Sequence, residues 1–150
     1  MKTTLKKIAA IVLVSASVLA LAACSKSYKK ISSDDFKTKL EKEGYTTMAS
    51  EGEDGAKETV LAYSEEAMVT YNLYDSKDAA KEMFDNLKET AKKAKDEGEI
   101  EKLSTSSNKI TAKDDSQYMV CVYVEDTVIV GMAAADDSSK LDSAFKALGY

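Results

Sequence analysis

The chain has 150 residues, with 21 lysines, no arginine, no histidine, no tryptophan and no proline, and its net charge is −5. This length suits one domain, and 44% apolar with 31% charged residues is the composition of a folded globular protein. The chain lacks histidine, the commonest general base and metal ligand, and two cysteines are too few for a zinc finger or a disulfide scaffold. We therefore expect no bound metal, no cofactor and no enzymatic activity.

The first 23 residues have the pattern of a secretory signal peptide. Lys2, Lys6 and Lys7 form a positively charged start, and residues 8–23 carry no charge. This uncharged run of 16 residues is shorter than the roughly 20 residues that a membrane-spanning helix needs. We expect the segment 1–23 to direct export and then to be cleaved.

The signal segment ends in Leu21, Ala22 and Ala23, and Cys24 follows it. These four residues resemble the lipobox of bacterial lipoproteins, in which an aliphatic and two small residues precede an invariant cysteine. The resemblance implies that cleavage follows Ala23 and that the Cys24 thiol carries a diacylglycerol. In overall plan the chain also resembles small lipoproteins of low-GC Gram-positive bacteria, a source that the use of lysine without arginine favours. The resemblance to these lipoproteins implies a lipid anchor on the extracytoplasmic side of the cell membrane.

Residues 24–31 are expected to form the lipidated cysteine and a short tether. The lysines of this tether, Lys26, Lys29 and Lys30, can approach anionic lipid head groups. Loss of the three signal-peptide lysines leaves 18 lysines against 26 acidic side chains, so the mature chain has a net charge of −8. This acidic balance, together with the lack of arginine, excludes nucleic-acid binding.

Residues 32–150 are predicted to form a single domain that begins with a helix. Ser32 has the position of an N-cap with Asp35 three residues later, and Ile31 can pack on Phe36, so we predict a helix to about residue 43. Alternating residues at 59–64 and 67–74 predict a hairpin. A second helix is then predicted from a cap at Asp75 or Ser76 to about residue 97, on the basis of apolar residues at helical spacing.

The second half of the domain repeats this order. Residues 103–115 are rich in Ser, Thr and Lys, which indicates a loop and a short edge strand. Residues 118–124 and 127–134 predict a hairpin of near-continuous apolar character, which is typical of central strands with both faces buried. A last helix carries apolar residues from Leu141 to Leu148. The sequence therefore predicts an α+β fold, an antiparallel sheet of five to six strands with about three helices packed on one face.

The two halves show a sequence repeat. A shift of 60 residues places Tyr63 on Tyr123, and one insertion then places Phe84 on Phe145. This pattern predicts a duplicated hairpin–helix unit, in which the two phenylalanines occupy equivalent core positions. The alternative is that any two amphipathic hairpin–helix units match in this way.

Residues with reactive side chains have structural explanations. The acidic turn at residues 51–55 does not have the spacing of a calcium-binding EF-hand loop. Acidic pairs at Asp34–Asp35 and Asp136–Asp137 precede or begin predicted helices, where negative charge complements the helix dipole. Cys121 lies within a predicted strand and is expected in the core, with no histidine to activate it.

The function that these observations favour is an anchored binding or interaction module, with a small ligand or an envelope protein as its partner. One alternative is an assembly or structural role in the envelope, through a sheet edge exposed near residues 109–115. The other alternative is a hydrolase that uses carboxylates.

Overall fold

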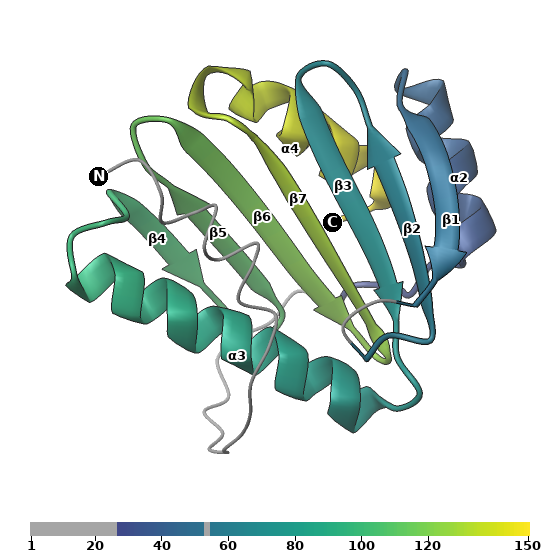
Figure 1. Cartoon of the computed structure of the whole chain (residues 1–150), viewed down its shortest axis with the longest axis horizontal. Helices are drawn as coiled ribbons and strands as arrows, with labels where there is room; N and C mark the ends of the chain where they lie inside the picture. Colours follow the sequence, from purple (N-terminus) through teal and green to yellow (C-terminus); the bar gives the residue numbers. More distant parts are fainter. Residues whose placement is uncertain (1–26, 53–54) are drawn as a thin grey trace.

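The computed structural model describes residues 27–52 and 55–150. They form a seven-stranded sheet of order β1-β2-β3-β7-β6-β5-β4, in which all neighbouring strands are antiparallel (Figure 1). The α+β class and the antiparallel sheet are thus confirmed. The strands are β1 (Thr46–Glu51), β2 (Glu58–Tyr63), β3 (Ala67–Leu73), β4 (Lys102–Thr105), β5 (Lys109–Lys113), β6 (Gln117–Val124) and β7 (Thr127–Ala134).

The predicted count of five to six strands was wrong because two outer strands carry little apolar pattern. Strand β1 has only Met48 and Ala49 as apolar residues, and neither is buried. Strand β4 is four residues long and polar apart from Leu103. The edge expected near residues 109–115 was also misplaced, because β5 pairs with both β4 and β6.

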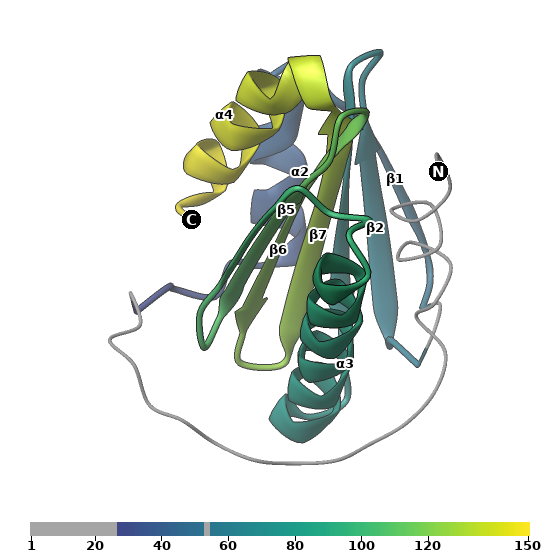
Figure 2. The same ribbon diagram turned by 90° about the vertical axis from the view of Figure 1, so that its left-hand side faces the viewer.

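Three α-helices of the described residues cover the sheet, and they lie on both of its faces. Helices α2 (Ser33–Lys42) and α4 (Ser138–Leu148) pack on one face, whereas α3 (Lys77–Asp96) packs on the other, as Figure 2 shows edge-on. We call these the α2/α4 face and the α3 face. The expectation that all helices share one face was therefore wrong. The physical reason is that the central strands β6 and β7 carry apolar side chains on both faces.

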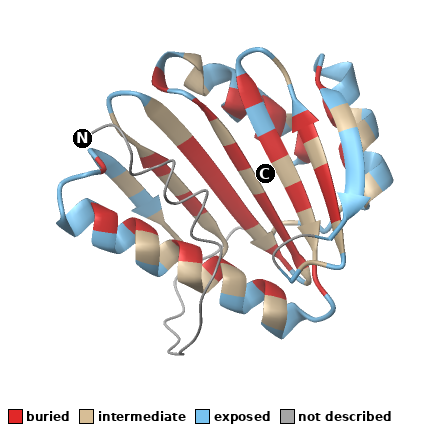
Figure 3. Ribbon diagram, in the orientation of Figure 1, coloured by how far each residue is buried: buried red, intermediate tan, exposed pale blue. Residues whose placement is uncertain are grey.

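Strands β6 and β7 are buried on both faces. On the α2/α4 face, Val120, Val122 and Ile129 pack with Phe36 and Phe145 in one core cluster. The alternate residues of the same strands form a second core cluster with α3, so a helix is needed on each face (Figure 3). This second cluster includes Phe84, Met119, Cys121 and Val128. Cys121 is fully buried, as expected, and burial raises the pKa of its thiol.

Local signals at the helix ends agree with the sequence. The Ser32 side chain accepts a hydrogen bond from the Asp35 amide at 3.1 Å, and the Ser76 side chain accepts one from the Ala79 amide at 3.1 Å. Helix α2 then ends before Gly44, whose φ of 90° is in the left-handed region that glycine adopts readily. The predicted caps of both helices are confirmed.

The structure does not support the duplicated hairpin–helix unit. Strands β3 and β7 are antiparallel neighbours, so the rotation that places the β2–β3 hairpin on the β6–β7 hairpin has its axis normal to the sheet. Such a rotation keeps each helix on its own face, whereas α3 and α4 lie on opposite faces. Phe84 and Phe145 are both buried, but in different clusters.

The segment before α2 is attached to the domain. The Tyr28 ring packs edge-on against the ring of Tyr150 at a centroid distance of 5.3 Å, and the Tyr150 hydroxyl donates to the Lys29 carbonyl at 3.1 Å. The Tyr71 hydroxyl donates to the Ile31 carbonyl at 3.3 Å. The expected tether is therefore held against the α2/α4 face from residue 28 onward.

An ion pair adds to this attachment. The Lys30 Nζ lies 2.6 Å from Asp126 Oδ1 in the β6–β7 turn, with both side chains about two-thirds buried. The hydrogen bond to Asp126 raises the pKa of Lys30. Burial alone would raise the pKa of Asp126, but the hydrogen bond and the charge of Lys30 outweigh it and lower that pKa. The negatively charged form of Asp126 is therefore more stable in the folded chain than in the unfolded chain.

Replacement of Asp126 by Asn should lower the free energy of unfolding by about 0.5–1 kcal/mol at neutral pH, as expected for a partly exposed ion pair. A carboxyl with a lowered pKa stabilises the fold above its unfolded pKa, about 3.9, and that contribution is lost as pH falls through its folded pKa. Urea unfolding of wild type and Asp126→Asn should therefore differ at pH 7, and the difference should disappear as the pH falls through the lowered folded pKa of Asp126. The exposed Asp115, changed to Asn, is the matched control. A constant difference down to low pH would contradict the pairing.

A side chain at Gly131 is expected to press on α4. A Cβ atom at this position would lie 2.5 Å from Leu141 Cδ1 and 2.5 Å from Phe145 Cε2, because α4 crosses β7 here. Gly131→Ala should therefore lower the free energy of unfolding by about 1–3 kcal/mol, the usual cost of overpacking. In a double-mutant cycle, Phe145→Leu should cost less in the Gly131→Ala background than alone. Additive costs would show that α4 does not press on this glycine.

Candidate functional site

The expected anchor lies outside the described residues. Leu21, Ala22, Ala23, Cys24 and Lys26 all belong to the segment that the structure does not describe. Of the other two tether lysines, Lys29 is exposed and Lys30 pairs with Asp126. Within residues 27–52 and 55–150, no helix is long and apolar enough to span a bilayer.

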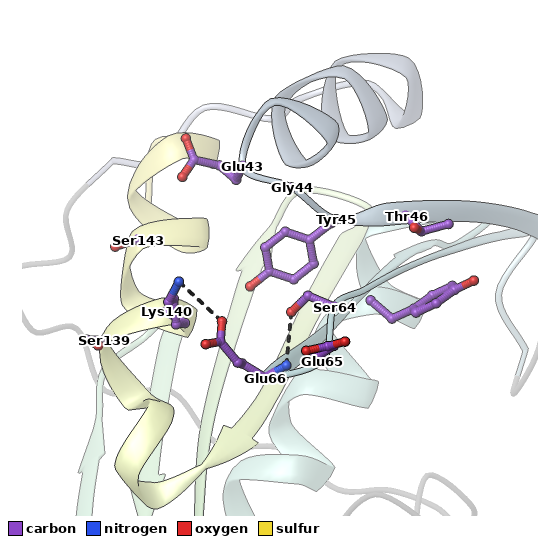
Figure 4. Close-up of a pocket in the computed structure, with 11 residues that line it drawn as sticks. Glu43, Gly44, Tyr45, Thr46, Ser64, Glu65, Glu66, Ser139, Lys140 and Ser143 are labelled. Atoms are coloured by element: carbon purple, nitrogen blue, oxygen red, sulfur yellow. Dashed lines mark hydrogen bonds and ion pairs between the residues drawn. The ribbon is translucent and has the colours of Figure 1, made fainter.

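A cavity of about 840 Å³ opens at the end of the sheet near the β2–β3 turn. Three separate chain segments line it, as the close-up in Figure 4 shows: residues 43–46 between α2 and β1, residues 63–66 in the β2–β3 turn, and the first turns of α4. Sequence analysis did not predict this site, because residues some 20 and 75 positions apart meet only in the folded chain. We call it the Tyr45 cavity.

Tyr45 is the most buried side chain of this cavity, with 7% of its surface exposed. Its ring extends from the start of β1 into the space between the β2–β3 turn and α4 (Figure 4). In the described part of the chain its hydroxyl has no hydrogen-bond partner. A buried hydroxyl without a partner costs about 1–3 kcal/mol, so a ligand that supplies one would recover this free energy.

The neighbouring Ser64 does not supply that partner. Its side chain already donates to the Ala67 carbonyl at 3.3 Å and accepts from the amides of Glu66 and Ala67 at 3.3 and 3.1 Å. Burial raises the pKa of Tyr45, and Ser64 lowers it to a smaller extent, although the two side chains form no hydrogen bond of normal geometry. The Tyr45 phenol is thus neutral at physiological pH and can donate or accept.

The rim of the Tyr45 cavity is acidic. Glu43, Glu65 and Glu66 line it with a single cation, Lys140. The Lys140 Nζ lies 3.2 Å from Glu66 Oε2, which leaves two carboxylates in excess. The remaining lining side chains are hydroxyl-bearing, among them Ser139 and Ser143 on α4. The site can therefore hold a polar molecule by hydrogen bonds, with a preference for positive charge.

The described residues contain no group of three acidic, cysteine or histidine side chains that could hold a metal ion. The acidic pairs Asp34–Asp35 and Asp136–Asp137 lie in α2 and in a 3-10 helix before α4, and none of these four residues lines the Tyr45 cavity.

No protein-family model and no curated protein sequence matches the chain. Among solved structures, a GTP-binding regulator from Thermotoga maritima is similar with a TM-score of 0.42 and 12% identity, over 78% of this chain and 87% of that one. A likeness at this level carries no argument about function.

Proposed function

We propose that the protein is a lipid-anchored, extracytoplasmic binding module whose ligand occupies the Tyr45 cavity. The observation that supports it is Tyr45, whose side chain lines an open cavity and whose buried hydroxyl lacks a partner among the described residues. Native proteins satisfy nearly all buried polar groups, so a partner from outside the chain is the simplest source of this hydrogen bond.

The ligand that fits this site is a small polar molecule with an amine. Hydroxyl groups of the ligand can exchange hydrogen bonds with Tyr45 and with the serines of α4, and an ammonium group can approach Glu43 and Glu65. Both carboxylates are exposed, so each contributes a modest interaction that weakens with salt. Affinity then depends mostly on the buried phenol.

The position of the cavity suits an anchored receptor. Strand β3 begins at the β2–β3 turn beside the cavity and ends next to the β6–β7 turn, where the Tyr74 amide donates to the Asp126 carbonyl at 2.8 Å (Figure 1). Seven residues of strand span roughly 20 Å. Cys24 is four residues before the attached Tyr28 and can lie at most about 14 Å from it. The Tyr45 cavity and the attached segment, residues 28–31, thus lie toward opposite ends of the sheet.

Lipidation is tested first. The wild-type chain expressed in a Gram-positive host should incorporate labelled palmitate and sediment with membranes, whereas Cys24→Ala should do neither. Cys121→Ala is the matched control, because it removes the other thiol but keeps the lipobox. Palmitate on both variants would overturn the anchor.

Ligand binding is tested with three sugars of equal size and different charge: glucosamine, glucose and glucuronate. Amide shifts in NMR spectra of the mature Cys24→Ala chain should show that glucosamine perturbs Tyr45, Ser64 and Ser143 most, and glucuronate least. Tyr45→Phe should weaken binding about three- to tenfold through the lost hydrogen bond. Tyr123→Phe, on the α3 face, is the control.

A cavity that prefers glucuronate, or in which none of the three sugars shifts these amides, would contradict the proposed ligand chemistry. An unchanged affinity in Tyr45→Phe would contradict the role of the phenol.

A further inference from the structure

A second surface, which meets the Tyr45 cavity at Thr46 and Tyr63, has features of a binding site: the outer edge of β1 and the sheet face beside it. Strand β1 pairs with β2 only, and no other strand in the described residues pairs with its outer edge. Five of its six residues are exposed (Figure 3). Its outward amide and carbonyl groups are therefore available to a further strand.

The α3 face is bare of helix near this edge. Helix α3 lies over β4, β6 and β7 (Figure 1). The register of β1, β2 and β3 places Met48, Leu61, Tyr63 and Met68 together on that face. Met48 is 58% exposed, Tyr63 40% and Met68 41%, and these are the large apolar side chains most exposed in the described chain. A contiguous exposed apolar patch of this kind marks an interaction surface.

The opposite side of the same edge is acidic. Glu51 and Glu58 are directly opposite each other in the β1–β2 register, on the α2/α4 face. Like charges in this position destabilise a sheet. Glu41 adds a third carboxylate near Thr47, whose hydroxyl donates to it at 2.6 Å. The edge thus has apolar side chains on one face and carboxylates on the other.

We propose that the β1 edge binds an extended basic polypeptide segment of another protein. Such a segment adds an eighth strand through main-chain hydrogen bonds. In a strand, alternate side chains point to opposite faces, so apolar residues would cover Met48 and its neighbours while lysine or arginine residues between them approach Glu51 and Glu58. The recognised chemistry is an alternation of apolar and basic residues.

Charge argues against a second copy of this chain as the occupant. Two copies of β1 related by a two-fold axis would pair antiparallel. That arrangement brings Glu51 of one copy toward Glu41 of the other, so like charges meet at both ends of the interface. With a mature net charge of −8, the chain as a whole also repels itself.

The test uses the mature lipidated chain in phosphatidylcholine nanodiscs, which have no net charge to attract a basic peptide. The probe is a fluorescent eight-residue peptide that alternates valine and lysine, and fluorescence anisotropy measures its dissociation constant. We expect binding that is at least about tenfold tighter than that of the valine–glutamate peptide. Two further versions of the valine–lysine peptide carry N-methyl groups on alternate amides, one on the valine amides and the other on the lysine amides. Only one of these sets of amides faces β1, so we expect one version to lose binding and the other to keep it.

Protein variants locate the binding surface. Glu51→Lys and Met48→Thr should each weaken binding about tenfold or more, whereas Glu82→Lys on exposed α3 should leave it unchanged. Tyr45→Phe should also leave the affinity for the peptide unchanged, which separates this proposal from that for the Tyr45 cavity. Any of three results would overturn the proposal. The valine–glutamate peptide could bind as tightly as the valine–lysine peptide, the two methylated versions could bind equally, or sedimentation velocity could show self-association through β1.

Discussion

Strands β6 and β7 have apolar side chains on both faces of the sheet, and the need to bury both sets decides where the helices lie. Ile129 faces α2 and α4, whereas its neighbour Val128 faces α3. A single layer of helices would leave one set in water, at a cost of about 1.5–3 kcal/mol for each large side chain. The sheet is therefore covered on both sides, and Gly131 lets α4 approach β7 closely.

Helix α3 cannot cover its whole face of a seven-stranded sheet. Its 20 residues extend about 30 Å, and it crosses the half that contains β4, β6 and β7. The other half is left to β1, β2 and β3, where Met48 and Met68 are exposed. Proteins usually protect such an edge with charged side chains, and Glu51 at the end of β1 is one of these. The same carboxylate that discourages self-pairing selects for a basic partner.

The parts of the fold that local patterns encode were predictable from sequence. The caps at Ser32 and Ser76, two hairpins and three helices follow from nearby residues. Strand β1 was missed because its side chains are exposed, and exposed strands lack the alternation that reveals them. The near-continuous apolar character of residues 118–124 already implied burial on both faces, so helices on one face contradicted it. The Tyr45 cavity was invisible because its three segments are distant in sequence, and Tyr45 resembles any aromatic residue that follows a helix.

Because residues 28–31 are attached to the domain, they fix how the proposed anchor is placed relative to both proposed binding sites. Lys30 is neutralised by Asp126 at the β6–β7 turn, so Lys29 is the tether lysine in the described chain that can still face anionic lipid. The acidic domain is repelled by the same surface. With the proposed anchor in place, attraction at the attached segment and repulsion elsewhere would together turn the attached segment toward the bilayer. Because β1 runs from the Tyr45 cavity toward that end of the sheet, the proposed anchor would hold its edge perpendicular to the membrane, where a segment can approach it from the side.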